Sequence, residues 1–83
     1  MIYAIEHPFK PWIKVGTTCD LKRRMREYQG YGMHVKPFFT CRGGRKEEKV
    51  IHSMLQSAWV GGEWFSCSKE AAVLALENKN LVA

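Results

Sequence analysis

Five side chains of this sequence have the chemistry to act on a charged ligand: Tyr3, Lys14, Arg24, Glu48 and His52. A phenol can hold or release a proton, and ammonium and guanidinium groups can bind an anion. A carboxylate can hold a metal cation, and an imidazole titrates near neutral pH. If the fold brings them together, these residue types suit the binding of a phosphate group and a reaction at it.

Tyr3 and Lys14 lie in two predicted strands, residues 1–6 and 12–17, and the turn between them holds two prolines. If opposite residue numbers of this antiparallel pair sum to 17, one face is uniformly apolar and can pack inward. Its members are Ile2, Ala4, Ile13 and Val15. The other face then has Tyr3 beside Lys14, whose charge is expected to lower the pKa of the Tyr3 phenol. An ordinary contact between an aromatic ring and a lysine is the alternative.

Arg24 lies in a predicted helix that begins at a Thr18 or Asp20 cap and ends at about Gln29. The apolar stripe of this helix comprises Leu21, Met25 and Tyr28. Arg24 flanks the stripe, so its guanidinium group can reach the sheet and bind a phosphate through two hydrogen bonds. The alternative is a basic helix face that only contacts solvent.

Glu48 and His52 stand one turn apart on a second predicted helix, residues 45–57, at the rim of its apolar stripe. A carboxylate at this rim can face a cleft. The neighbouring Glu47 could exchange roles with it. His52 could position water, contact phosphate or orient Glu48, although a lone helix histidine is often structural.

The remaining elements complete a single α+β domain over residues 1–83. Residues 34–42 predict a third strand, in which Pro37 indicates an edge or a bulge. Residues 63–66 are short and extended, and Ser68 caps a last helix. The expected architecture is a small three-stranded, mostly antiparallel sheet flanked by helices, with a ββαβα core.

The net charge of +5 is concentrated in the first part of the chain. Residues 1–49 hold 11 of the 13 lysines and arginines against five acids, whereas residues 50–83 hold two against three. This asymmetry indicates a surface that faces a polyanion, with a solubilising surplus as the alternative. The candidates for contacts with a nucleic-acid backbone are Lys22, Arg23, Arg26, Arg42, Arg45 and Lys46.

Composition excludes several other classes of protein. The three cysteines form no C-x-x-C pair, so neither a disulfide framework nor a zinc knuckle is expected. The N-terminal residues lack the features of a secretory signal, and no stretch approaches the roughly 18 apolar residues of a transmembrane helix. A cytoplasmic protein with no membrane partner is the expectation.

The order of these motifs resembles the GIY-YIG endonuclease superfamily, especially its compact phage-type branch. The matching segments are Ile2-Tyr3, Lys14-Val15-Gly16, Arg24, Glu48-Lys49-Val50-Ile51-His52 and Glu63-Trp64-Phe65. Met1 stands where the first motif has a glycine. Lys14 stands where the second motif has a tyrosine, as is frequent in this branch.

The resemblance implies a metal-dependent endonuclease that hydrolyses nucleic-acid phosphodiester bonds with one Mg²⁺ or Mn²⁺ ion. Glu48 would hold the metal, and Tyr3 would act as general base or position the water. Lys14 would assist Tyr3 or hold the phosphate, and Arg24 would bind the scissile phosphate. His52 would complete the catalytic set.

Two further functions stay open on the same fold: a nucleic-acid-binding module that does not cut, and a protein-interaction module. The nuclease is favoured, because a carboxylate in a phosphate-binding cleft would repel the ligand of a pure binder. The expected partner is nucleic acid, with DNA favoured. The chain has no room for a sequence-reading domain, so a homodimer or a partner protein could supply specificity.

Overall fold

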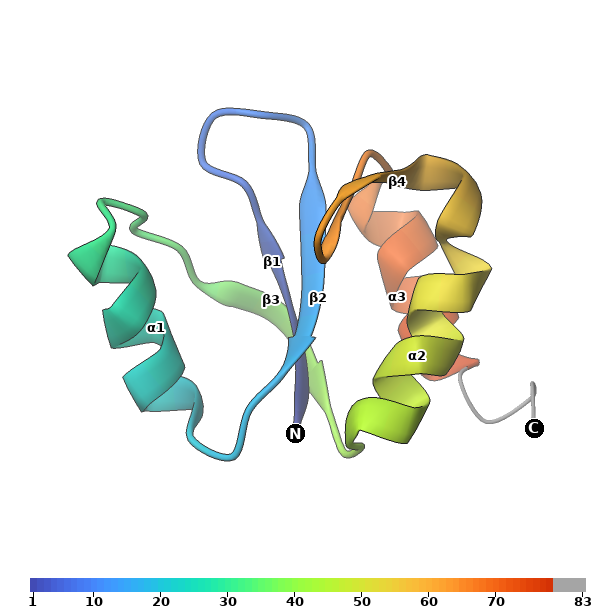
Figure 1. Cartoon of the computed structure of the whole chain (residues 1–83), viewed down its shortest axis with the longest axis horizontal. Coiled ribbons are helices and arrows are strands. Elements are labelled where there is room, and N and C mark those ends of the chain that lie inside the picture. Colours follow the sequence, from blue (N-terminus) through green and yellow to red (C-terminus); the bar gives the residue numbers. More distant parts are fainter. Residues whose placement is uncertain (79–83) are drawn as a thin grey trace.

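A five-stranded antiparallel sheet lies at the centre of the molecule, with helix α1 on one face and helices α2 and α3 on the other (Figure 1). The computed structural model describes residues 1–78. Its elements in chain order are β1 (Ile2–Glu6), β2 (Ile13–Thr17), α1 (Leu21–Gly30), β3 (Pro37–Cys41), α2 (Arg45–Met54), the short 3₁₀ helix η1 (Gln56–Ala58), β4 (Trp59–Gly61), β5 (Trp64–Phe65) and α3 (Lys69–Glu77). Residues 79–83 of the predicted domain lie outside the described residues.

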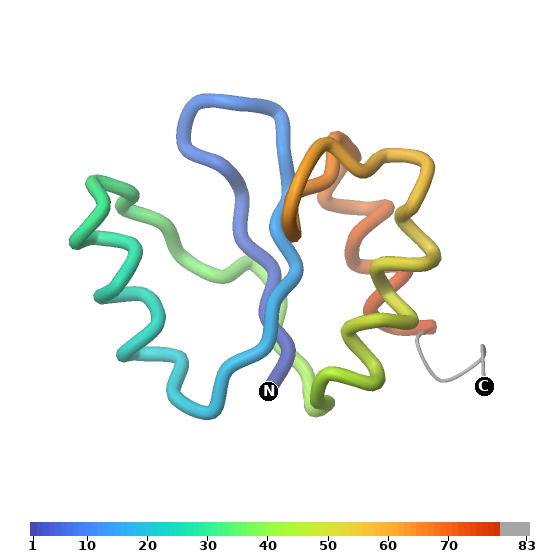
Figure 2. The backbone as a smooth tube through the Cα atoms, viewed as in Figure 1, coloured from blue at the N-terminus to red at the C-terminus, as the bar shows by residue number. Residues whose placement is uncertain are grey.

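The strands are ordered β3-β1-β2-β5-β4 across the sheet. The continuous trace in Figure 2 shows that β3 carries the chain from α1 on one side of the sheet to α2 on the other. Each face of the central hairpin is therefore covered by helical segments from a different part of the sequence.

The α+β prediction is confirmed, but the three-stranded sheet with a ββαβα core is wrong. The second helix ends at Met54 rather than near residue 57, and a β4–β5 hairpin follows it. Gly62, with φ of 55°, forms the turn of this hairpin. Strand β5 then pairs with β2. Without this pairing, the backbone donors and acceptors on that side of β2 would have no partners. Strands of three and two residues are too short to show a periodicity in the sequence.

The β1–β2 hairpin has the predicted alternation but a different register. Opposite residue numbers sum to 19, so Tyr3 faces Gly16 and Ala4 faces Val15. A sum of 17 would place Pro11 opposite Glu6, and proline has no N–H group to donate to a strand ladder. The observed register leaves both prolines in the loop, which His7 closes by donating its N–H to the Trp12 carbonyl at 2.8 Å.

The two faces of this hairpin pack into two separate clusters. The larger cluster lies under α2 and α3 and contains the predicted apolar face of the hairpin together with Ile51, Phe65 and Leu76. The smaller cluster lies under α1, and its buried members are Tyr3, Ile5 and Tyr28.

Side-chain caps define the beginnings of α1 and α3. Asp20 accepts a 3.1 Å hydrogen bond from the Arg23 N–H, which selects it over Thr18 as the cap of α1. Ser68 accepts one from the Ala71 N–H, as predicted for the last helix. Strand β3 is an edge strand whose register shifts near Pro37, which confirms the edge and bulge prediction there. None of the helices in residues 1–78 has the length and apolar run needed to cross a bilayer.

Candidate active site

Tyr3 is the central polar side chain on the α1 face of the sheet, and it is completely buried. Its hydroxyl oxygen lies 2.7 Å from that of Tyr28 and accepts a 3.4 Å hydrogen bond from Nη1 of Arg24. Tyr28 and Arg24 reach Tyr3 together because they stand one turn apart on α1. The structure therefore joins Tyr3 and Arg24, with Tyr28 as an additional member of the group.

Gly16 provides the space that the Tyr3 ring occupies. A Cβ atom at Gly16 would lie 2.8 Å from the Tyr3 hydroxyl oxygen and 3.2 Å from Oε1 of Glu63. Any larger residue would collide with the ring. The Tyr3 hydroxyl group therefore lies over the backbone of β2 at Gly16, on the same face as the Glu63 carboxylate.

The pKa of Tyr3 is raised well above the ordinary value for a phenol. Burial is the main cause, followed by the hydrogen bond to Tyr28, while Arg24 and the charge of Lys14 act in the opposite direction. Burial also raises the pKa of Tyr28. Lys14 lowers the pKa of Tyr3 as expected, but the net shift is upward, because the cost of burying a phenolate exceeds the attraction of the nearby cations. Both phenols are protonated at neutral pH.

Lys14 lies diagonally from Tyr3 rather than directly beside it, because the register places Ile5 opposite Lys14. Its ammonium nitrogen lies 3.7 Å from Oε1 of Glu63. The same nitrogen lies 5.1 Å from the centre of the Tyr28 ring, over which its positive charge is stabilised. Lys14 thus forms one wall of a site that Tyr28 and Glu63 also enclose.

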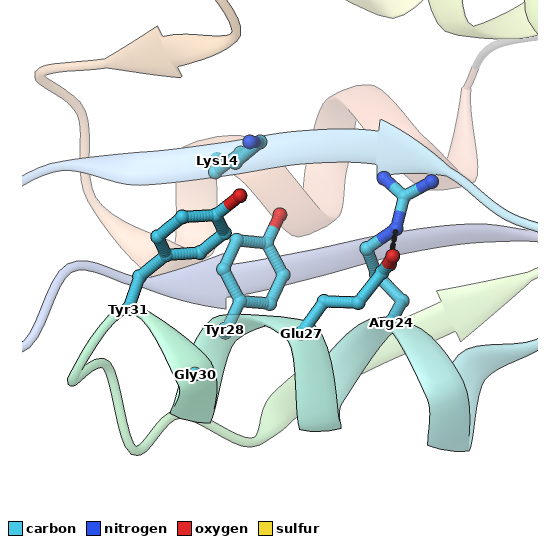
Figure 3. A pocket seen from close by; sticks show the side chains of 6 residues that line it. All are labelled: Lys14, Arg24, Glu27, Tyr28, Gly30 and Tyr31. Atoms are coloured by element: carbon cyan, nitrogen blue, oxygen red, sulfur yellow. Dashed lines mark hydrogen bonds and ion pairs between the residues drawn. The ribbon is translucent and has the colours of Figure 1, made fainter.

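A groove of about 490 Å³ runs between β2 and α1, and Figure 3 shows the side chains that line it. Its lining residues are Lys14, Arg24, Glu27, Tyr28, Gly30 and Tyr31. Nε of Arg24 lies 3.1 Å from Oε1 of Glu27, in an ion pair that is partly open to solvent. The groove therefore presents two cations and one carboxylate, together with two aromatic rings.

The carboxylates of Glu47 and Glu48 differ in their hydrogen bonds, and this difference assigns them different roles. Oε2 of Glu47 accepts a 3.1 Å hydrogen bond from the Gly44 N–H and so caps α2. Oε2 of Glu48 is buried and has no hydrogen-bond partner among the described residues. A buried carboxylate oxygen without a partner costs about 1–3 kcal/mol or more, because a carboxylate can only accept hydrogen bonds.

His52 holds α2 against strand β2 through a hydrogen bond to the buried Val15. Its Nε2 lies 2.9 Å from the Val15 carbonyl oxygen, which can only accept, so Nε2 carries a proton. Its ring packs against Phe65 with the ring centres 5.1 Å apart. Because Nε2 is used in this way, Nδ1 is the nitrogen that remains for a second contact.

Glu48 lies closer than His52 to the end of β2 at which Gly16 and Thr17 stand. Helix α2 and strand β2 run in opposite directions (Figure 1), and four helical residues span about 6 Å. The start of α2 is also held near the end of β2, since a Cβ atom at Gly43 would lie 2.5 Å from Ile2, the partner of Thr17. Helix α2, which carries Glu48, thus packs against β2 on one face of the sheet, while Tyr3 and Arg24 lie together on the other face.

Comparison with known protein families assigns the chain to one of them. The T5orf172 domain matches residues 1–78, nearly the whole sequence. The chain belongs to the T5orf172 domain family. Searches among curated proteins and among solved structures gave no significant match. T5orf172 domains are found in phage proteins and are related to nuclease families.

The basic residues predicted to contact a nucleic-acid backbone form two exposed groups in this T5orf172 domain. Lys22, Arg23 and Arg26 lie on α1, and none of them lines the groove, because Lys22 and Arg26 project from the face of the helix opposite Arg24. Arg42, Arg45 and Lys46 lie around the β3–α2 connection, near the beginning of the helix that holds Glu48.

Glu27 and Tyr28 line the groove but were not predicted to be part of the site. Tyr28 was interpreted only as part of the buried stripe of α1, and its ring is indeed buried. Its spacing of four residues from Arg24 could have indicated that both reach Tyr3. The spacing of three residues on a predicted helix could likewise have indicated the ion pair of Arg24 with Glu27.

Proposed function

We propose that this T5orf172 domain is a metal-dependent endonuclease of the GIY-YIG type that hydrolyses nucleic-acid phosphodiester bonds, with DNA as the first substrate to test. The observation that carries the proposal is the buried Oε2 of Glu48, which has no partner among the described residues. A domain that only binds phosphate would gain nothing from a carboxylate in this place. The family's relation to nucleases supports the same proposal.

Glu48 suits Mg²⁺ or Mn²⁺ as a single carboxylate ligand. A bound cation would provide the partner that Oε2 lacks, and Mg²⁺ keeps most of its coordinated water when proteins bind it. Residues 1–78 contain no group of three or more histidine, cysteine or acidic side chains around one point. Water and substrate oxygens would therefore supply the other ligands. When bound, the ion would stabilise the negative charge that develops on the leaving oxygen.

Arg24 and Lys14 are the groups proposed to hold the scissile phosphate. Each is already paired with an acid, Arg24 with Glu27 at 3.1 Å and Lys14 with Glu63 at 3.7 Å. Both pairs are partly exposed, so they contribute little to stability and can be exchanged for a phosphate. A guanidinium group binds two phosphate oxygens at once, which orients the phosphorus for attack from one side.

The Tyr3–Tyr28 pair is proposed to orient the attacking water. The two hydroxyl groups have two protons but share one hydrogen bond, so one O–H group is left to donate elsewhere. The raised pKa of both phenols keeps them neutral, and the proposed role is therefore positioning, with proton removal left to a group or water at the site. His52 is proposed to hold α2, and with it Glu48, against β2.

The test is cleavage of labelled supercoiled plasmid, single strands and branched DNA in Mg²⁺, in Mn²⁺ and in EDTA. Cleavage by the wild-type protein should require the metal. Glu48→Gln should lower the rate at least about 100-fold, the loss expected when a group that stabilises transition-state charge is removed. Glu77→Gln changes an exposed glutamate on α3 and serves as the matched control, which should cleave at the wild-type rate.

Arg24→Lys tests the phosphate role separately, because it keeps the charge but loses the two-point contact. Cleavage that persists in EDTA or in Glu48→Gln would overturn the proposed metal ligand. Salt-sensitive binding without cleavage of any substrate would instead show a binding module that does not cut. Neither binding nor cleavage would direct attention to a protein partner.

A further inference from the structure

Tyr31 is the most exposed aromatic side chain beside the groove, and neither the core nor the proposed chemistry uses it. It lies at the C-terminal end of α1, and 85% of its surface is exposed. An aromatic ring held in water at this position leaves a large apolar surface uncovered. The residue is therefore a candidate for a contact with a ligand rather than a contributor to stability.

Tyr31 forms a continuous surface with the phosphate-binding residues. It lines the same groove as Arg24, Tyr28 and Lys14. Figure 3 shows the rings of Tyr28 and Tyr31 projecting side by side from α1 toward β2, with Arg24 nearer the start of the helix. Tyr31 stands seven positions after Arg24, which corresponds to about 10 Å along the helix axis.

This combination of groups matches the chemistry of a single nucleotide strand. The groove volume of about 490 Å³ lies within the usual range for small-ligand sites. The groove supplies two cations, Arg24 and Lys14, and each is paired with a partly exposed carboxylate that a backbone phosphate can replace. A distance of about 10 Å spans no more than about three stacked nucleotides at roughly 3.4 Å each.

Resting on the proposed function, we infer that the groove between β2 and α1 binds an unpaired nucleotide flanking the scissile phosphate, with its base stacked on the exposed ring of Tyr31. Only an unpaired or terminal base presents a free face to such a ring, because the bases inside a duplex are stacked on each other. The substrate is then a single strand, a flap or a frayed junction rather than a continuous duplex.

The experiment measures binding in EDTA, so that cleavage is not needed for its outcome. The probes are a deoxyoligonucleotide and a ribo-oligonucleotide that contain 2-aminopurine, each tested single-stranded and paired with its complement. Wild-type protein should bind a single strand more tightly than the duplex and should quench the 2-aminopurine fluorescence by stacking. Tyr31→Ala should weaken single-strand binding about tenfold, from the usual contribution of one stacked base, and should leave duplex binding unchanged.

Two matched variants identify the ring as the cause. Tyr31→Phe keeps the ring and should retain both affinity and quenching. Phe9→Ala removes a second ring that is also 85% exposed but lies in the β1–β2 loop outside the groove, and it should have no effect. Equal losses for duplex and single strand in Tyr31→Ala, unchanged single-strand binding in that variant, or no binding by the wild type would each overturn the inference. A protein that binds in this way without cutting would contradict only the proposed nuclease activity.

Discussion

The two faces of the central sheet differ in how apolar their buried side chains are. The face under α2 and α3 is covered by a continuous apolar cluster, and its polar groups lie at the rim, where Glu48 and His52 stand. Among residues 1–78, the cluster under α1 has three buried members, and two of them carry hydroxyl groups that bond to each other. The face under α2 and α3 therefore supplies most of the stability, and the face under α1 can hold polar side chains and an open groove.

Ile51→Ala should produce the largest loss of stability, because this completely buried side chain lies in the middle of the larger cluster. The expected loss in the free energy of unfolding is about 2–5 kcal/mol. Met25→Ala on the α1 face should cost clearly less, since Met25 is only partly buried. Urea denaturation measures both variants, and Ile51→Val provides a milder change if the alanine variant does not fold. Equal losses on the two faces would contradict the division between them.

Glu48→Gln should separate stability from activity. It should lower cleavage at least about 100-fold while raising the free energy of unfolding by about 1 kcal/mol in EDTA, because a neutral amide replaces a carboxylate whose Oε2 is buried without a partner among the described residues. Mg²⁺ should raise the melting temperature of the wild-type protein but not that of the variant. Thermal melts with and without Mg²⁺ give a result that does not depend on activity. A variant less stable than the wild type in EDTA would show that Glu48 has a structural role.

Gly16→Ala should damage the α1 face through a single methyl group. The new Cβ atom would lie 2.8 Å from the Tyr3 hydroxyl oxygen, so the ring must move. The expected cost is about 1–3 kcal/mol, together with a loss of cleavage. Gly30→Ala is the control, because its Cβ atom would meet nothing within 4 Å and should be neutral or slightly stabilising. A neutral Gly16→Ala would show that Tyr3 has room to shift.

The smallest effect is expected at alkaline pH. Since burial raises the pKa of Tyr3 in the folded protein, the stability it contributes is complete below about pH 10 and is lost as the pH rises above that value. One such group accounts for at most about 1.4 kcal/mol per pH unit. Tyr3→Phe should therefore make the fall in stability between pH 10 and pH 11.5 less steep in urea denaturation. An identical slope in the variant would show that the phenol ionises as easily in the folded state as in the unfolded one.

Much of the local structure could be predicted because it depends on neighbouring residues. The alternation in β1 and β2 correctly separated the apolar face of Ile2 and Val15 from the face of Tyr3 and Lys14. The caps of α1 and α3 were likewise predictable, since a cap needs only one side-chain oxygen near the first N–H groups. The predicted extended segment 63–66 contains β5, but strand β4 and the pairing of β5 with β2 and β4 could not be predicted, because strands this short exist only through such pairing.

The sequence by itself determined which side chains share a face, where two of the helices begin, and that Arg24 flanks a buried stripe. These properties follow from the periods of strands and helices. Only the tertiary structure decided the hairpin register and the direction of the Tyr3 pKa shift. It also decided that Glu47 caps α2 while Oε2 of Glu48 stays without a partner among the described residues. Each of these depends on burial and on partners from distant parts of the chain. A phenol beside a lysine becomes more acidic in water, but beneath α1 the loss of solvent outweighs the attraction of the lysine.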